Sequence, residues 1–96
     1  GQVTILKDHI PLITFLRPGL IEIGKNEKFY AEDGTVEFSN NNLLILSTTV
    51  QSLKNMKTEK INIMLKEAEN RLSASEITDK QKYILNYKIE TLKQIN

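Results

Sequence analysis

Side chains that commonly perform acid–base or nucleophilic chemistry are sparse in this chain. The single histidine, His9, directly follows Asp8, and no other pair comes as close to part of a catalytic site. Adjacent residues in a strand or turn usually point apart, however. The sequence also has no cysteine, second histidine or GxSxG serine elbow to complete a triad or a metal set. We therefore predict that the chain has no catalytic residues and is not an enzyme.

Patterns for binding small molecules or nucleic acid are also weak. The carboxylates are scattered singly, and the glycines form neither a GxGxxG nor a GxxxxGK[ST] phosphate loop, so we expect no cofactor and no metal ion. Phe29 and Tyr30 face opposite sides of an expected strand, and that half of the chain is acidic, so we expect no nucleic-acid partner. Tyr83 and Tyr87, four residues apart, can stack, but packing with solvated hydroxyls is the commoner role.

Composition and charge indicate an ordinary globular chain with two different halves. Its 96 residues are 40% apolar and 26% charged, which fits one domain or a small domain with an appendage. The longest apolar run, residues 43–46, is far too short to span a bilayer, so we expect no direct membrane insertion. The formal net charge is −2 for residues 1–49 and +3 for residues 50–96. The basic half suits an acidic protein partner or simply solvated helix faces.

The first half reads as a series of short strands. Alternating apolar residues separated by turn residues predict strands at 3–7, 12–16, 20–23, 28–32, 35–38 and 43–49. Pro18 and Gly19 mark one bend, and the Asp33–Gly34 pair is a hairpin signal. Because the connections are too short for crossover helices, we predict an antiparallel sheet arranged as a meander or a sandwich.

The second half changes to helical periodicity. Apolar positions at 61, 64, 65, 68 and 72 predict one amphipathic helix, with Asn55 or Thr58 as its N-cap. Thr78 and Gln81 form a capping box before a second stripe at 84, 85, 89, 92 and 95. The predicted fold is α+β: an antiparallel β-sandwich (1–49) followed by an antiparallel two-helix hairpin (50–96).

The opening residues resemble the epsilon subunit of the F-type ATP synthase, which is called delta in mitochondria. The family segment G-x-x-G-I-L-x-G-H-A-P-L-L-T-x-L-K-P-G-x-x-x-I is matched by Gly1, Ile5, Leu6, His9, Pro11, Leu12, Thr14, Leu16, Pro18, Gly19 and Ile23, with Arg17 for the lysine. A later family pattern, G-G-x-x-E-V-x-x-N-x-V-x-I-L, is matched by Gly34, Glu37, Asn41, Ile45 and Leu46. The helical hairpin follows at the expected place, so the likeness covers the whole chain.

This resemblance implies a noncatalytic rotor subunit of the central stalk, peripheral on the cytoplasmic face of the bacterial inner membrane. The sandwich would join the gamma subunit to the c-ring, and the hairpin would restrain ATP hydrolysis. Asp8, His9, Ile10 and Pro11 would form the loop that faces the c-ring. On the hairpin, Lys60, Arg71, Lys82 and Lys88 would contact an acidic segment of the beta subunit. The alternative is a free-standing β-sandwich adaptor with oligomerising helices, unrelated to ATP synthase.

The sequence departs from the family in three respects. The family's first strands have no counterpart before Gly1, so we expect either a fragment or a partner copy that completes the sandwich by self-association. Asp8 and Asp33 replace glycines. The ATP-binding motif I/L-D-x-x-R-A of some relatives reads M-K-T-E-K-I at residues 56–61, which lacks both the aspartate and the arginine, so we do not expect nucleotide sensing.

Overall fold

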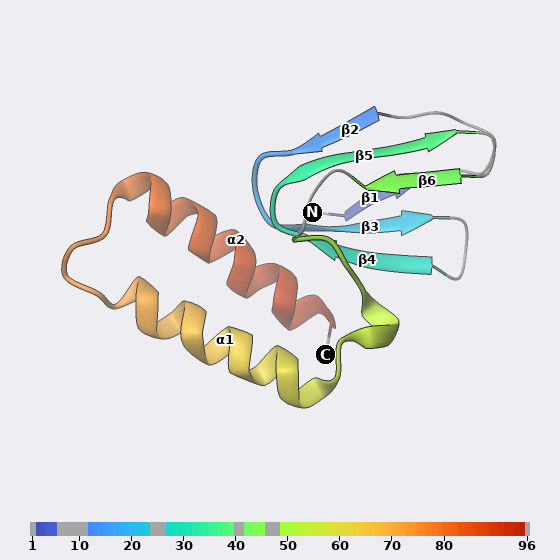
Figure 1. Cartoon of the computed structure of the whole chain (residues 1–96). Coiled ribbons are helices and arrows are strands. Elements are labelled where there is room, and N and C mark those ends of the chain that lie inside the picture. The colour runs from blue at the N-terminus through green and yellow to red at the C-terminus, as the bar shows by residue number, and fades with distance from the viewer. Residues whose placement is uncertain (1, 6–11, 24–26, 40–41, 46–48, 96) are drawn as a thin grey trace.

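The chain folds into a two-sheet sandwich followed by a helical hairpin (Figure 1). The computed structural model describes residues 2–5, 12–23, 27–39, 42–45 and 49–95. Within these ranges the elements are β1 (Gln2–Ile5), β2 (Leu12–Phe15), β3 (Gly19–Ile23), β4 (Glu27–Ala31), β5 (Gly34–Ser39), β6 (Asn42–Ile45), β7 (Gln51–Ser52), a 3₁₀ turn (Leu53–Asn55), α1 (Thr58–Leu72) and α2 (Asp79–Ile95). The predicted fold class, a β-sandwich followed by a two-helix hairpin, is confirmed.

The strands form two sheets that share one apolar core. One sheet has the strand order β1-β3-β4-β7 and the other has the order β2-β5-β6. Phe15 of the second sheet packs with Ile21, Ile23 and Ala31 of the first, and Phe29 and Val50 lie against this cluster. Side chains of alternate residues therefore meet between the sheets, as expected for a sandwich.

Strand β3 is buried on both of its faces. Ile21 and Ile23 point into the core between the sheets, whereas Leu20 belongs to a second cluster with Tyr30 and the helices. Because Leu20 and Tyr30 are directly paired, their side chains share the face opposite the inter-sheet core. The sheet that contains β3 is thus a middle layer, with the second sheet on one side and the hairpin on the other. This double burial explains the nearly continuous apolar character of β3.

Two predictions about strand pairing were too simple. The Asp33–Gly34 turn joins β4 to β5, but these strands lie in different sheets, so the hairpin prediction is wrong at this position. Gly34 has a φ of 125°, which strongly favours glycine and lets the chain turn from one sheet into the other. In addition, β1 pairs with β3 in parallel. This is possible because β2, which separates them in sequence, lies in the other sheet and so replaces a crossover helix.

The two helices begin differently. The capping box is confirmed: the backbone N–H of Gln81 donates to Thr78 Oγ1 at 3.1 Å, and the backbone N–H of Thr78 donates to Gln81 Oε1 at 2.9 Å. The predicted N-cap of α1 is wrong. Asn55 lies in the 3₁₀ turn and Thr58 is already helical, so Lys57 occupies the cap position without a side-chain hydrogen bond.

The hairpin packs beside the sandwich and extends beyond it. The molecule measures 47 × 26 × 20 Å, because the far ends of both helices and the turn between them project from the sheets (Figure 1). Strand β7 pairs with β4 just past the predicted boundary between 49 and 50, and the division into two units at that boundary stays a prediction. Neither helix in the described part of the chain is both long and apolar enough to cross a membrane.

Candidate functional site at the sandwich–hairpin junction

The residues predicted for partner binding fall into two groups. The loop Asp8, His9, Ile10 and Pro11 lies outside the described residues, so its role as a c-ring contact stays a prediction. Of the four basic hairpin residues, Lys60, Arg71 and Lys82 are exposed and Lys88 is partly buried. Lys60 and Lys88 contact the sandwich. Lys60 Nζ donates to Gln51 Oε1 at 2.7 Å, and Lys88 Nζ lies 2.9 Å from Glu32 Oε2. Two of the four, Lys60 and Lys88, therefore lie at the junction between sandwich and hairpin.

An apolar cluster forms the centre of this junction. Leu20 and Tyr30 from the sheet meet Met56 before α1, Ile61 on α1 and Leu92 on α2. Tyr30 and Leu92 have no exposed surface. Partly buried side chains that complete the cluster are Leu53, Met64, Leu65 and Ile95. Since both helices contribute, the hairpin docks through the apolar stripes predicted from the sequence.

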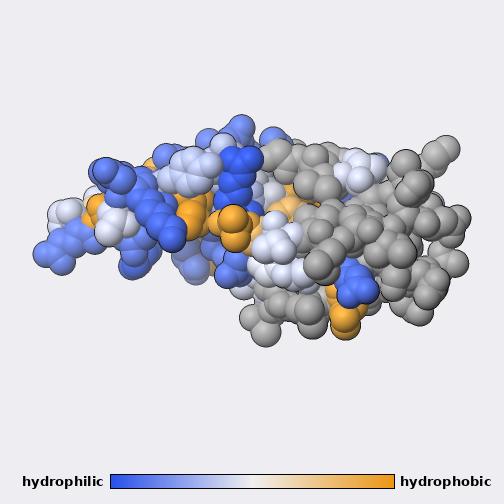
Figure 2. All heavy atoms as spheres, turned by 90° about the horizontal axis from the view of Figure 1, so that it is seen from above, coloured by the Kyte–Doolittle hydropathy of each residue, from blue (hydrophilic) through white to orange (hydrophobic). Residues whose placement is uncertain are grey.

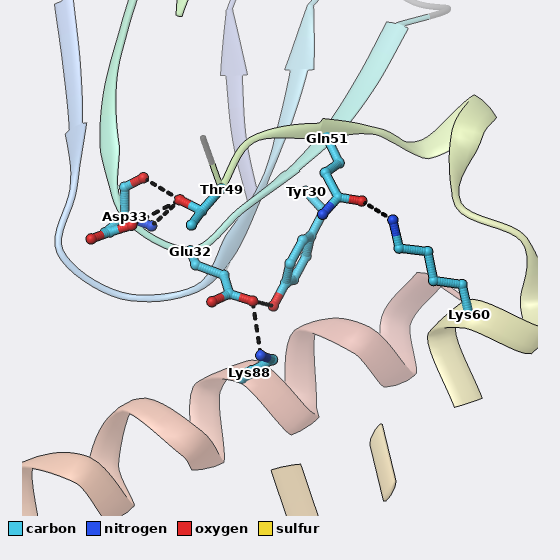
Figure 3. Close-up of polar contacts among 7 residues, drawn as sticks. All are labelled: Tyr30, Glu32, Asp33, Thr49, Gln51, Lys60 and Lys88. Carbon is cyan, nitrogen blue, oxygen red and sulfur yellow. Dashed lines mark hydrogen bonds and ion pairs between the residues drawn. The ribbon is translucent and has the colours of Figure 1, made fainter. Parts of the chain in front are cut away.

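A shared carboxylate lies beside the apolar cluster (Figure 3). The hydroxyl of Tyr30 donates to Glu32 Oε2 at 3.0 Å, and the same oxygen accepts the ion pair from Lys88 on α2. The side chains of Lys88 and Glu32 are 24% and 29% exposed, so this pair is partly shielded from solvent. Burial, reinforced by the charge of Glu32 and its hydrogen bond, raises the pKa of Tyr30 above its ordinary value. The tyrosine therefore remains a hydrogen-bond donor further into the alkaline range than an exposed tyrosine does.

Arg17 forms a second, exposed junction with α2. Its Nη1 donates to the hydroxyl of Tyr83 at 3.1 Å, and its Cζ lies 4.1 Å from the ring centroid of Tyr87. The two tyrosine rings meet edge to face with centroids 4.9 Å apart. Hydrogen bonding by Tyr87 and then by Arg17 lowers the pKa of Tyr83, and hydrogen bonding to Tyr83 raises the pKa of Arg17. The guanidinium thus bridges the turn between the sheets and the second helix.

Of two further polar contacts, one joins α2 to the sandwich and the other lies within the sandwich. The hydroxyl of Thr91, buried on α2, donates to the backbone carbonyl of Pro18 at 3.4 Å. Thr49 Oγ1 donates toward the Asp33 carbonyl at 2.7 Å and lies 2.8 Å from Asp33 Oδ1 (Figure 3). This second contact ties the turn after β4 to the segment that leads into β7. On the face seen in Figure 2, the surface of the projecting hairpin is mainly hydrophilic, with some apolar side chains between the polar ones.

A shallow pocket lies at the start of α1. It is lined by Asn55, Lys57, Glu59, Lys60 and Ile63, so part of it is formed by the segment 56–61 that was compared above with a nucleotide motif. The aspartate and arginine of that motif are replaced by Lys57 and Lys60, so the pocket lacks the residues through which the family would hold a nucleotide.

Sequence reasoning missed the two charged residues that organise the junction. Arg17 was noted only as a substitute for a lysine, and Glu32 only as the end of a strand. Their partners on α2 are 66 and 56 residues further along the chain, so no local spacing could reveal them. The one available signal was the pair Tyr83 and Tyr87 on one helix face. The interpretation of these residues as packing side chains is consistent with their edge-to-face contact.

The fold and junction define a β-sandwich protein with a docked two-helix arm. Residues 1–52 match the family model described as ATP synthase, Delta/Epsilon chain, beta-sandwich domain. The ATP synthase epsilon chain of Pelagibacter ubique is 43% identical over 99 residues, and the match covers 100% of this chain and 76% of the relative. The chain therefore belongs to the ATP synthase delta/epsilon family.

More distant relatives carry the same name. The ATP synthase epsilon chain of Psychrobacter arcticus is 33% identical over 76 residues, covering 75% of this chain and 55% of the relative. That of Lactobacillus gasseri is 23% identical over 103 residues, covering 100% of this chain and 70% of the relative. The chain thus spans about three quarters of the Pelagibacter relative, and its match spans about half of the Psychrobacter one. Membership in this family sets aside the alternative of an adaptor unrelated to ATP synthase.

Proposed function

We propose that this chain is a noncatalytic rotor subunit of a proton-translocating F-type ATP synthase. In this role the sandwich couples the gamma subunit to the c-ring, on the cytoplasmic face of the bacterial inner membrane. The observation that carries the proposal is the family match over the sandwich together with 43% identity to an ATP synthase epsilon chain. The layered architecture supports it, since a middle sheet covered on both faces gives a stiff body suited to transmitting torque.

Co-purification with a gamma subunit tests the coupling role. We would co-express the chain with the gamma subunit of Pelagibacter ubique, the organism of the 43% identical relative, and separate the products by size exclusion. A stable one-to-one complex is expected. Elution of the two chains as separate species, with each chain folded, would refute the proposal. The isolated chain should show no ATP hydrolysis, and robust turnover would contradict the noncatalytic assignment.

We also propose that the hairpin restrains ATP hydrolysis through its basic residues. Arg71 and Lys82 are exposed in the docked hairpin and are therefore available to an acidic segment of the beta subunit. Deleting residues 50–96 is the direct test, but it also uncovers Leu20 and Tyr30 of the sheet. Charge reversal at Arg71 and Lys82 avoids that problem, because neither side chain is buried. Hydrolysis by the reconstituted enzyme should rise in the reversed variant.

The matched control for this experiment is charge reversal at Lys54. This residue is also exposed and basic, but it lies in the 3₁₀ turn before the hairpin. If reversal at Arg71 and Lys82 leaves hydrolysis equal to that of the control, the hairpin does not inhibit through these charges. Such a result would leave the coupling role of the sandwich untouched, because coupling is measured by complex formation.

A further inference from the structure

The docked hairpin is attached to the sandwich by an apolar strip and by a parallel polar strip. On α2 the apolar contacts gather toward the C-terminal end, at Leu92 and Ile95. The polar contacts of α2 with the sandwich begin nearer the N-terminal end of the helix, at Tyr83, and continue through Lys88 to Thr91. Close to the hairpin turn, the described contacts of α2 with the sandwich are therefore the polar ones.

We propose that Arg17 and Glu32 form a polar clasp that fixes α2 on the sandwich. The Arg17 arm of the clasp is the contact of Arg17 with Tyr83 and Tyr87, and the Glu32 arm is the contact of Glu32 with Lys88. Release of the hairpin begins at the exposed Arg17 arm. This clasp is a property of the isolated chain. It does not depend on which subunits the protein binds.

The Arg17 arm is the weaker and more accessible one. Arg17 is exposed, and Tyr83 retains 52% of its surface. Arg17 makes one hydrogen bond to Tyr83 and one contact with the ring face of Tyr87, and water and salt reach both contacts easily. Tyr83 lies in the second turn of α2, close to the projecting end of the hairpin. Opening here frees the distal part of α2 without disturbing the buried cluster around Leu92.

The Glu32 arm is the stronger one. A single carboxylate oxygen accepts both the hydroxyl of buried Tyr30 and the ammonium of Lys88. Hydrogen bonds to a charged group are about twice as strong as neutral ones, and partial burial reduces screening by salt. Breaking this arm leaves Tyr30 facing an uncompensated carboxylate. The pair therefore resists release until the distal contacts have opened, and while closed it also neutralises Lys88.

Native-state hydrogen exchange of the full chain tests this proposal. Arg17→Met should speed exchange of the first turns of α2, residues 82–87, roughly two- to fivefold, because it removes the exposed arm only. Glu32→Gln should speed exchange along all of α2 by about three- to tenfold, since a neutral amide binds Lys88 and Tyr30 less tightly. Tyr83→Phe, which keeps the ring but loses the hydroxyl, should reproduce part of the Arg17→Met effect.

The matched control is Lys28→Met. Lys28 also pairs with a glutamate, Glu22, at 3.6 Å, but both residues lie within the sheet. Its removal should leave α2 exchange unchanged. Arg17→Lys keeps the charge without the planar fork, so it should recover only part of the lost protection.

A distance measurement gives an independent readout. The chain has no cysteine, so spin labels can be placed on cysteines at exposed Thr14 and Ser75, on the second sheet and the hairpin turn. The native chain should give one dominant distance, and Arg17→Met combined with Glu32→Gln should add a longer, broader population.

If α2 exchange in both single variants stays within twofold of Lys28→Met, the apolar cluster alone holds the hairpin and the clasp is refuted. Uniform acceleration along α2 in Arg17→Met would refute the order of release.

Discussion

Replacing Leu92 with alanine should destabilise the whole molecule. Leu92 is fully buried on α2 and packs against Leu20 and Tyr30 of the sheet and Ile61 of α1. The change removes three carbon atoms, and at about 0.8 kcal/mol per buried methylene the transfer contribution alone is roughly 2.4 kcal/mol. The cavity left behind adds to this loss. We expect a decrease of about 3 kcal/mol in the free energy of unfolding, within the usual range for buried leucines.

Urea denaturation can measure this loss. A chain of 96 residues is expected to have a total stability of roughly 5 to 14 kcal/mol, so the change is a large fraction of it. With an m-value of about 1 to 2 kcal/mol/M, the midpoint should move down by roughly 1.5 to 3 M. Helix unfolding is followed by circular dichroism. Unfolding of the sandwich is followed by the fluorescence of Tyr30 in a Tyr83→Phe, Tyr87→Phe background, since the other two tyrosines lie on α2 and the sequence has no tryptophan. Because Leu92 joins both parts, the two signals should shift together.

Leu44→Ala is the control for this prediction. Leu44 is 50% exposed on β6 and is not part of the junction cluster, so its truncation should cost no more than about 1 kcal/mol. A loss below about 1 kcal/mol for Leu92→Ala would refute the reasoning. So would a shift of the helix signal with an unchanged tyrosine signal, because the hairpin would then unfold without support from the sheet.

Three further predictions concern local features. The raised pKa of Tyr30 means that the native state holds its proton more tightly than the unfolded state, so stability is full below pH 10 and falls as pH rises above it. Alkaline denaturation should show this decline, and Tyr30→Phe should flatten it. Gly34→Ala should cost about 1 to 3 kcal/mol in thermal or urea unfolding, since a β-carbon is disfavoured at a φ of 125°. Thr78→Ala, which removes half of the capping box, should cost about 1 kcal/mol and increase hydrogen exchange in the first turn of α2, whereas exposed Ser75→Ala should not.

The sequence predicted the elements well because their signals are local. Alternation located the described strands to within about two residues, apart from the end of the strand predicted at 43–49, which corresponds to β6 (Asn42–Ile45), and helical stripes located α1 and α2. The capping box was recognisable because its two residues are three apart. Strand β7 was missed, since two residues carry no periodicity. The N-cap of α1 was misplaced because Asn55 ends the 3₁₀ turn and the helix already begins at Thr58, which leaves Lys57 at the cap position.

Pairing between strands was less predictable because it depends on the sheet that each strand joins. A turn such as Asp33–Gly34 carries the same residues whether it closes a hairpin or crosses between sheets. The difference arises from burial: Ala31 and Phe15 pack in one core although their strands are not paired. Side-chain contacts of this kind, like those of Arg17 and Glu32, join residues far apart in sequence and leave no local pattern.

The middle sheet also limits how freely the hairpin can move. Docking of the hairpin buries Leu20 and Tyr30 of the sheet against the apolar stripes of both helices. Undocking would expose both surfaces to water, at a cost of roughly 25 cal/mol per Å² of apolar area, and would also separate Lys88 from Glu32. In the isolated chain the released hairpin should therefore be a minor state. We expect it to become the major state only where another surface covers the apolar stripes and offers carboxylates to the lysine freed from Glu32, since a ligand shifts such an equilibrium only by its differential affinity for the two states.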